Sequence, residues 1–258
     1  MIIKLRYKNR KIQFNLQRHS DYSSFYLVYV EKSYQHLLEV IRPVNVVIDA
    51  GANIGIFTVL SSILVGKQGV VVSIEPNPEN LKVVRENIEL NTLTNVTVVD
   101  RALWSSSNVE VSLVLKGVMS RIQLDGKDVQ SRYANVKTVT FDDLVDDLKL
   151  VPTVLTMDIE GAEKYALKKV SKTFESLKHV EAEIHDRDSE DAIMSFSGFD
   201  FEKAHIENFG EVWKFAFRDP IKTANLERHN RFETSKRVLH RGTGLGDTYP
   251  YIIYMRRR

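Results

Sequence analysis

Cysteine is absent from the 258 residues of this chain. Its absence excludes disulfide bonds, thiolate metal sites and cysteine nucleophiles. A secretory signal is also missing, because no apolar run follows the basic start of the chain. The longest mainly apolar stretch, residues 44–66, is interrupted by Asp49, Asn53 and three glycines, whereas a membrane-spanning helix needs about 20 predominantly apolar residues. We therefore expect a soluble, cytoplasmic protein without a membrane partner.

The overall composition is that of an ordinary globular chain, with 43% hydrophobic and 27% charged residues. Such values argue against a disordered or fibrous protein. Because domains usually contain about 100–200 residues, the length indicates one large domain or one domain with added segments.

Positive charge is concentrated at the two ends of the chain, although the net charge is only +2. Residues 1–20 contain six basic residues and no acid, and residues 218–258 contain ten basic residues against four acids. The first 217 residues therefore carry −4, the difference between +2 and +6. Basic ends on an acidic body are compatible with a polyanionic partner such as RNA. Solubility is the simpler interpretation, because no stripe of aromatic residues is interleaved with the basic ones.

Two short alternating runs open the chain. Residues 2–7 and 11–16 alternate apolar and polar side chains on either side of Lys8-Asn9-Arg10, which predicts a β-hairpin. Residues 25–41 become helical toward their end, where Pro43 stops the helix.

From Val44 onward the chain alternates strands with helices. The β-branched run at residues 44–48 is typical of strands that are buried on both faces, and residues 70–74 form a second run of this kind. The predicted order is strand 44–48, helix 54–65, strand 70–74, helix 78–91, strand 96–99, an antiparallel pair at 108–116 and 135–140, helix 141–148, strand 153–157, helix 161–170 and strand 180–184. This order predicts an α/β fold, with a mostly parallel sheet and helices on both faces. We assign residues 35–258 to this domain and residues 1–34 to an N-terminal hairpin extension.

The C-terminal part departs from this alternation. Strands are expected at residues 199–206, 212–217 and 249–255, as antiparallel additions to the sheet. Residues 219–247 are polar with little periodicity, and a stretch of that length without elements is unusual in a compact domain. We therefore expect a functional flap or an irregular insertion there.

The turn after the first buried strand has the features of a ligand-binding loop, because open α/β sheets bind ligands at the carboxyl ends of their strands. Asp49 closes the strand, Gly51 permits a tight turn, and Gly55 allows a close approach of helix and strand. Ala52 and Asn53 complete the loop. The glycine spacing differs from that of the dinucleotide fingerprint, and a carboxylate beside the ligand suits a cationic group better than a phosphate.

The next two strands also end in candidate cofactor-binding residues. Glu75 lies 24 residues after Gly51, close to the offset of about 20 residues at which an acid accepts hydrogen bonds from ribose hydroxyls. The end of the third strand is placed to border an adenine ring. The other candidates at these two strand ends are Pro76, Asn77, Asp100, Arg101 and Ala102.

Five segments of the chain resemble a known family. Asp49–Gly55 and Glu75–Pro78 resemble the first two motifs of class I S-adenosyl-L-methionine (SAM) methyltransferases. Thr138–Leu144, Met157–Glu163 and Glu183–His185 resemble the FkbM-type family of these enzymes specifically.

The resemblance covers about residues 35–185, with the five segments in the right order. Thr156 is a departure, because such sequences often carry lysine two residues before the aspartate. The resemblance implies a Rossmann-like, seven-stranded methyltransferase sheet with a final antiparallel strand. It also implies SAM as the methyl donor and, typically, O-methylation.

Three residues are the catalytic candidates. Methyl transfer from SAM is an in-line displacement, so much of the catalysis comes from positioning. A hydroxyl acceptor also needs a base within hydrogen-bonding reach. Asp158 and Glu160 follow the strand at 153–157, and His185 ends the next strand, so the three side chains are expected to converge. We place Asp158 at the methionyl end of SAM and assign Glu160 or His185 as the base.

Two other interpretations of these residues stay open. Carboxylates with one imidazole suit a divalent metal that binds an acceptor diol, although the sequence shows no fixed ligand spacing and we assign no metal. Alternatively, Glu160 caps a helix start, where the helix dipole favours an acid, and His185 is simply exposed.

The favoured function is therefore a SAM-dependent O-methyltransferase acting on a hydroxyl of a small molecule or glycan. An RNA methyltransferase that uses the basic ends, and a non-catalytic SAM-binding protein, are the alternatives. An NADH-dependent oxidoreductase is disfavoured by the glycine spacing. The acceptor, metal dependence and oligomeric state are left open.

Overall fold

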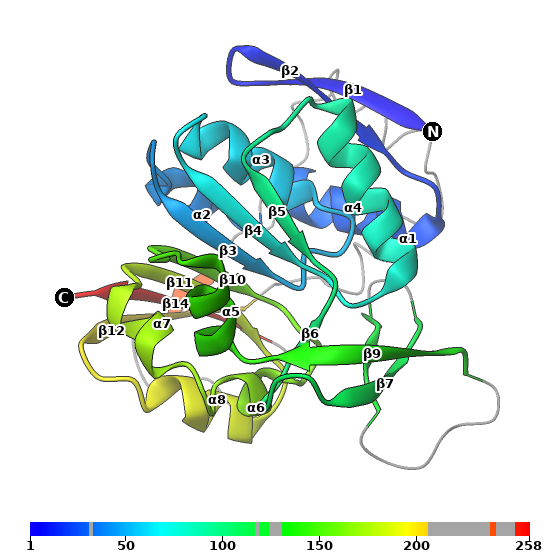
Figure 1. The fold of residues 1–258 in the computed structure, drawn as a ribbon. Helices are drawn as coiled ribbons and strands as arrows, with labels where there is room; N and C mark the ends of the chain where they lie inside the picture. The colour runs from blue at the N-terminus through cyan, green and yellow to red at the C-terminus, as the bar shows by residue number, and fades with distance from the viewer. Residues whose placement is uncertain (31–32, 117–118, 124–130, 206–237, 241–250) are drawn as a thin grey trace.

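The computed structural model describes residues 1–30, 33–116, 119–123, 131–205, 238–240 and 251–258 (Figure 1). The strands of its main sheet are β3 (Val46–Ala50), β4 (Val70–Ile74), β5 (Val96–Val99), β10 (Val154–Met157), β11 (His179–Ile184), β12 (Phe199–His205), β13 (Val238–His240) and β14 (Tyr251–Arg257). Their order is β13-β12-β14-β11-β10-β3-β4-β5. The strands from β11 to β5 pair in parallel, and β14 is antiparallel to both of its neighbours. The predicted mostly parallel, seven-stranded sheet is confirmed, and the short strand β13 is added at its edge.

Successive residues of the central strands face opposite sides of the sheet, and both sides are covered. Val47 and its partners in register, Val71 and Val154, belong to one hydrophobic cluster. The next residue, Ile48, belongs with its own partners to the other cluster. Burial on both faces explains why these strands are nearly continuous apolar runs rather than alternating ones.

Helices cover both faces, as predicted (Figure 1). One cluster includes residues of α2 (Gln35–Val40), α3 (Ile56–Val65) and α4 (Pro78–Leu90). The other includes residues of α5 (Phe141–Leu148), α7 (Ser171–Ser176) and α8 (Arg187–Met194). No helix among the described residues is long and apolar enough to cross a membrane.

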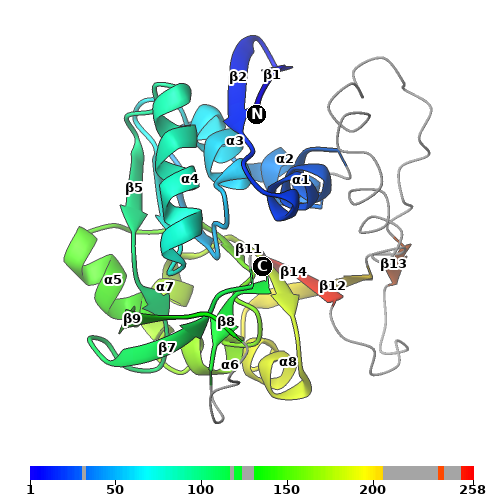
Figure 2. The ribbon, with the colours of Figure 1, turned by 90° about the vertical axis from the view of Figure 1, so that its right-hand side faces the viewer.

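The predicted N-terminal hairpin is present as β1 (Ile2–Tyr7) and β2 (Arg10–Asn15), and it lies against α4 (Figure 2). The backbone N–H of Gln13 donates to Asn91 Oδ1 at 2.9 Å, and that of Asn15 donates to Asn87 Oδ1 at 2.7 Å. Asn87 and Asn91 lie one helical turn apart, so they meet alternate N–H groups of the β2 edge. The hairpin and α1 (His19–Phe25) contribute to the same hydrophobic cluster as α3, and the boundary at residue 34 stays a prediction.

A second sheet lies beside the main one. It has the order β6-β9-β7-β8, with β6 (Ala102–Leu103), β7 (Glu110–Val114), β8 (Arg121–Ile122) and β9 (Tyr133–Val139). The predicted antiparallel pair is confirmed as β7 and β9.

Two helices differ from the sequence expectation. The region 161–170 forms only the short α6 (Glu163–Ala166), because Glu160 and Gly161 hold positive φ angles of 54° and 90° before it and Val170 leaves the helical region after it. The region 25–41 is split into the end of α1, a π-helix at Tyr26–Val30 and α2.

The C-terminal strands predicted at 199–206 and 249–255 are confirmed as β12 and β14. The strand predicted at 212–217 lies outside the described residues. Within 219–247, expected to be irregular, the described residues 238–240 form β13, which pairs with β12.

Candidate functional site

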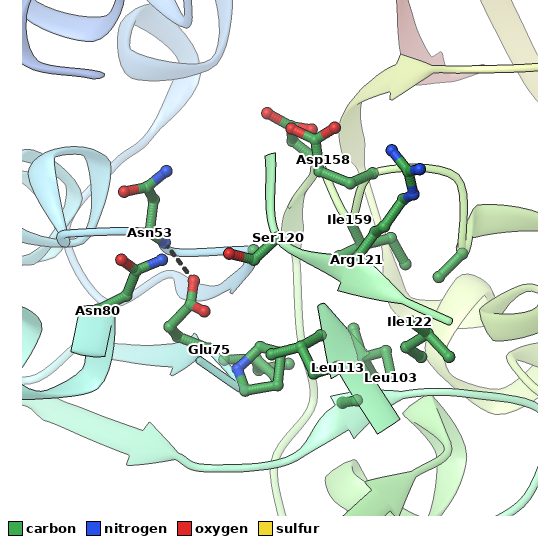
Figure 3. Close-up of a pocket in the computed structure, with 16 residues that line it drawn as sticks. Asn53, Glu75, Asn80, Leu103, Leu113, Ser120, Arg121, Ile122, Asp158 and Ile159 are labelled. Atoms are coloured by element: carbon green, nitrogen blue, oxygen red, sulfur yellow. Dashed lines mark hydrogen bonds between the residues drawn. The ribbon is translucent and has the colours of Figure 1, made fainter. Parts of the chain in front are cut away.

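The carboxyl ends of the parallel strands meet at one edge of the sheet, and most of the predicted site residues lie there. Asp49 is near the end of β3, Glu75 follows β4, Asp158 follows β10, and His185 follows β11. Figure 3 shows Glu75 and Asn53 on one side of a cavity and Asp158 at another side of it.

Gly51 forms the tight turn that was expected after β3. Its φ angle is +86°, and a Cβ placed on it would come within 1.8 Å of the backbone oxygen of Asp158. The N–H groups of Gly51 and Ala52 both donate to the carbonyl oxygen of Ile74 at 3.0 Å. The loop therefore packs against the ends of two neighbouring strands, and only glycine fits its first position.

Glu75 is a buried carboxylate that connects two loops. Its Oε2 accepts the N–H of Asn53, and its Oε1 accepts the N–H of Asn77, both at 2.8 Å. Burial raises the pKa of Glu75 to about 7, although the two backbone hydrogen bonds oppose the rise. The side chain of Asn77 caps α4 by accepting the N–H of Glu79. Glu75 and Pro76 line the cavity, and Asn77 is not among its lining residues.

Asp49 is also buried, with 4% of its surface exposed. Its Oδ2 accepts the hydroxyl proton of Thr58, which lies on the first turn of α3. Burial raises the pKa of Asp49 to about 7, and the hydrogen bond from Thr58 opposes the rise. The backbone of Thr58 also donates to Asp49, so the first turn of α3 supports this carboxylate through both the hydroxyl and the N–H of one residue.

Of the three cofactor-binding candidates after the third strand, β5, only Ala102 lines the cavity. Ala102 lines the cavity, together with Leu103, which sequence reasoning did not single out. Asp100 is exposed, and the Arg101 guanidinium donates to Asn108 Oδ1 at 3.2 Å, outside the cavity lining. The chain turns after residue 101 because Ala102 and Leu103 pair with β9 as strand β6.

Two cavities adjoin at this edge. The first, of about 570 Å³, is lined by Glu75, Ala102 and Leu103 among others. The second, of about 1180 Å³, lies between α1, α3 and the ends of β10 and β11. The residues that line both cavities are Gly51, Asn53, Asp158 and Glu160.

Two polar atoms at this junction have no partner. Asn53 Oδ1 and Asp158 Oδ1 are shielded from solvent and form no hydrogen bond with the described part of the chain. Buried acceptors without partners are costly in a native protein, and they are a common sign of a ligand that completes them.

His185 lies at the centre of a group of four carboxylates. Its Nδ1 is 3.0 Å from Glu163 Oε1, and Glu163 is fully buried. Its Nε2 is 3.9 Å from Asp158 Oδ1, 3.7 Å from Glu160 Oε2 and 3.8 Å from Glu183 Oε1. Asp158, Glu160 and His185 thus converge as expected. Glu163 and Glu183 belong to segments that resemble the family, but neither was named as a site candidate.

The pKa values in this group are strongly perturbed. Burial alone would lower the pKa of His185, but the hydrogen bond with Glu163 and the surrounding negative charges raise it to about 10. Burial, followed by the charge of Asp158, raises the pKa of Glu160 to about 8. The pKa of Glu183 is also raised, first by burial and then by Asp158.

The alternative in which Glu160 merely caps a helix does not describe this geometry. The helix α6 begins at Glu163, and its cap residue, Ala162, makes no side-chain hydrogen bond. Glu163 Oε1 instead accepts the N–H groups of Ile159 at 3.3 Å and Gly161 at 3.2 Å. The side chain of His185 is only 18% exposed.

The N-terminal segment contributes to the second cavity in a way that the sequence did not indicate. Ser23 and Ser24 of α1 line it, as do Ser33 and Tyr34 before α2. These residues carry no motif, and the packing of α2 and of the π-helix at Tyr26–Val30 against α3 places them beside the strand ends.

The comparisons with known proteins concern the fold and the family of the chain. A candidate rRNA methylase from Clostridium thermocellum has a similar fold, with a TM-score of 0.50 at 9% identity, over 88% of this chain and 94% of that one. A candidate methyltransferase from Streptococcus mutans, solved in complex with SAH, gives a TM-score of 0.47 at 12% identity, over 95% and 100%. The fold is that of the class I methyltransferases.

The family follows from the sequence comparison. A family model described as the methyltransferase FkbM domain matches residues 49–219, which is more than half of the chain. The chain therefore belongs to the FkbM methyltransferase family, and it is a SAM-dependent methyltransferase. The FkbM methyltransferase from Methylobacillus flagellatus gives a TM-score of 0.44 at 20% identity, over 74% of this chain and 52% of that one. No curated protein matches the sequence.

Proposed function

We propose that this protein transfers the methyl group of SAM to a hydroxyl of a small molecule or a glycan. The observation that carries the proposal is the junction of two cavities at Gly51, Asn53, Asp158 and Glu160. Transfer requires a donor and an acceptor that meet end to end. Two adjoining cavities with carboxylates where they meet suit that requirement.

The first cavity suits the adenosine half of SAM. The Glu75 carboxylate accepts the N–H of Asn53 on one oxygen and the N–H of Asn77 on the other, and it also accepts a hydrogen bond from the side chain of Asn80. Because a carboxylate has about four acceptor positions, one remains for a ribose hydroxyl. Leu103 and Leu113 supply an apolar surface for the adenine ring. Asp100 and Arg101 lie outside the lining, so we leave them out of this proposal.

The junction suits the methionyl end. Asn53 Oδ1 is an unpartnered acceptor, and Asp49 lies in the adjoining lining, so both can receive the N–H groups of an ammonium. Asp158 borders both cavities and faces the donor and the acceptor. A carboxylate-rich site of this kind favours the positive charge of SAM.

Glu160 is the proposed base, because its side chain lines both cavities and belongs to the turn beside Asp158. SAM supplies an electrophilic methyl on sulfur, so that an O–C bond forms as the S–C bond breaks and its electron pair stays on sulfur. Glu160 takes the hydroxyl proton, which leaves a methyl ether and a neutral thioether. His185, the alternative base named from the sequence, lies beside Glu160, but with a pKa of about 10 it is protonated near neutral pH, so we favour Glu160.

The test is calorimetric titration with SAM, SAH and NADH on the wild type, Glu75→Ala and Glu89→Ala. Glu89 is an exposed residue of α4, so its substitution controls for the loss of a carboxylate. We expect SAM and SAH to bind, with affinity lost by about tenfold or more in Glu75→Ala only, because charge-assisted hydrogen bonds contribute about 1.5–3 kcal/mol each. Absence of SAM binding by folded wild type, or tight NADH binding, contradicts the proposal.

The acceptor is tested separately. With an RNA acceptor held by the basic ends, affinity falls steeply as salt rises. A neutral small molecule or glycan shows little dependence on salt. A non-catalytic SAM-binding protein would keep its function after Glu160→Gln, whereas a base in this position contributes about 10²–10⁴-fold to the rate. The expected cytoplasmic location belongs to this proposal and is checked by cell fractionation.

A further inference from the structure

We propose that Asp158, Glu183 and His185 form a binding site for a divalent cation. One carboxylate oxygen from each acid and one ring nitrogen of the histidine lie within 4.8 Å of one another. The three residues come from the ends of the neighbouring parallel strands β10 and β11. The site borders the second cavity, which all three residues line.

The distances suit ligands around an ion better than hydrogen-bonded pairs. His185 Nε2 lies 3.9 Å from Asp158 Oδ1 and 3.8 Å from Glu183 Oε1, and both distances exceed that of a hydrogen bond. Ligands that each lie about 2.1 Å from one ion can be up to about 4.2 Å apart. A cation between these atoms would contact all three with small side-chain movements.

Glu163 prepares His185 for this role. Its buried carboxylate accepts the Nδ1–H of the imidazole at 3.0 Å and also the N–H groups of Ile159 and Gly161. With Nδ1 as the donor, Nε2 is the ring nitrogen that faces the two carboxylates, and it would bind a metal after releasing its proton. A carboxylate that orients a histidine through its second nitrogen is the usual arrangement behind a metal ligand.

A second observation is independent of this arrangement. Asp158 Oδ1 is shielded from solvent and accepts no hydrogen bond within the described residues. Glu183 has only 13% of its side chain exposed. A cation would satisfy both oxygens and offset the repulsion between carboxylates that face one another at short range.

The ligand set indicates the kind of ion. Two carboxylates and one imidazole, with positions open toward a cavity, suit Mn²⁺ or a similar divalent ion, whereas Mg²⁺ prefers oxygen ligands alone. Such an ion would bind the acceptor oxygen and lower its pKa before methyl transfer. This catalytic role rests on the proposed function, but the binding of the cation does not.

The experiment is titration of the full chain with Mn²⁺, in the absence of SAM and acceptor. Free Mn²⁺ is followed by electron paramagnetic resonance, because bound Mn²⁺ loses its sharp signal. The variants are Glu183→Gln and His185→Asn, which remove proposed ligands, and Glu160→Gln, which removes a charge 3.7 Å from the same nitrogen. Asp146→Asn removes an exposed carboxylate elsewhere.

One Mn²⁺ per chain is expected, with the affinity lowered by about tenfold or more in Glu183→Gln and His185→Asn. Asp146→Asn is expected to stay within about threefold of the wild type, because an exposed charge is screened. Glu160→Gln is expected to weaken binding less than Glu183→Gln, because it removes a nearby charge and no ligand atom. No binding by the wild type up to millimolar Mn²⁺, or equal losses in Glu160→Gln and Glu183→Gln, overturns the site. SAM binding, measured in parallel, checks folding and keeps this result separate from that of the proposed function.

Discussion

The backbone of Gly51 lies directly against the carbonyl oxygen of Asp158, so closely that a Cβ at residue 51 would be 1.8 Å from that oxygen. The contact joins the loop after β3 to the residue that follows β10. Because Asp158 borders both cavities, the fit between these two backbones sets where the carboxylate lies.

Gly51→Ala is expected to displace the end of β10 and to weaken SAM binding by about tenfold or more. A positive φ angle costs about 1–3 kcal/mol in a residue other than glycine, and the clash adds to it. Gly198→Ala is the matched control, since its φ angle is +84° and its nearest neighbour, an Arg257 nitrogen, would be 3.9 Å away. Urea unfolding and calorimetry measure both variants. Equal losses of SAM affinity in the two variants would show that backbone strain, and not the clash with Asp158, causes the effect.

The pKa of Glu75, raised to about 7, predicts a dependence of stability on pH. The unfolded chain releases this proton near the ordinary value of 4.5, and the folded chain retains it until about pH 7. The free energy of unfolding therefore falls between these pH values and is constant above them. The difference of about 2.5 in pKa corresponds to about 3 kcal/mol.

Glu75→Gln removes this titration. At pH 5 the free energy of unfolding of this variant is expected to be lower than that of the wild type, because the amide cannot accept both backbone N–H groups. Between pH 5 and 8 it is expected to change less than that of the wild type. Glu89→Gln, on the exposed face of α4, should keep the slope of the wild type. Chemical denaturation at several pH values gives the slopes. Parallel profiles for the wild type and Glu75→Gln would contradict the raised pKa.

Thr58→Val is expected to lower the free energy of unfolding by about 1–3 kcal/mol, because the buried carboxylate of Asp49 would lose the hydroxyl hydrogen bond and keep only the one from the backbone of residue 58. Thr58→Ser keeps the hydroxyl and should retain most of the stability. The comparison is made by urea denaturation at pH 8. If the valine variant is as stable as the wild type, the hydroxyl hydrogen bond does not support the carboxylate.

Asn91→Ala is expected to loosen the N-terminal hairpin. Its side chain accepts the N–H of Gln13 and donates to the carbonyl oxygen of the same residue at 2.6 Å. We expect faster hydrogen exchange at Gln13 and a loss of about 1–2 kcal/mol in stability. Glu89→Ala, on the same helix but exposed, should leave the exchange unchanged. Unaltered exchange at Gln13 in Asn91→Ala would show that apolar packing alone holds the hairpin.

Much of the site is visible in the sequence because strand ends are local features. Asp49, Glu75 and Asp158 each lie at or just after a β-branched or apolar run, and parallel strands bring such ends to one edge. Glu163 and Glu183 stand in segments that resemble the family, but nothing local assigns them a role. Glu183 lies within β11, and Glu163 opens a helix, so only the folded chain shows that both approach His185.

Two of the three candidate residues after β5 were predicted incorrectly from the local sequence. Asp100 and Arg101 directly follow β5, as Glu75 follows β4, but they lie outside the cavity. The pairing of Ala102 and Leu103 with β9 turns the chain and presents those two residues instead. That pairing joins residues more than 30 positions apart, which no local pattern encodes.

The sequence by itself determined the order of strands and helices, the glycine turn and the acids at the strand ends. These features depend on side-chain alternation and on backbone preferences within a few residues. Tertiary structure decided which carboxylates surround His185, which strand-end residues face the cavities, and which groups are buried. Burial and distance set the pKa values and the ligand geometry, and both arise only when the loops after β3, β10 and β11 pack against one another.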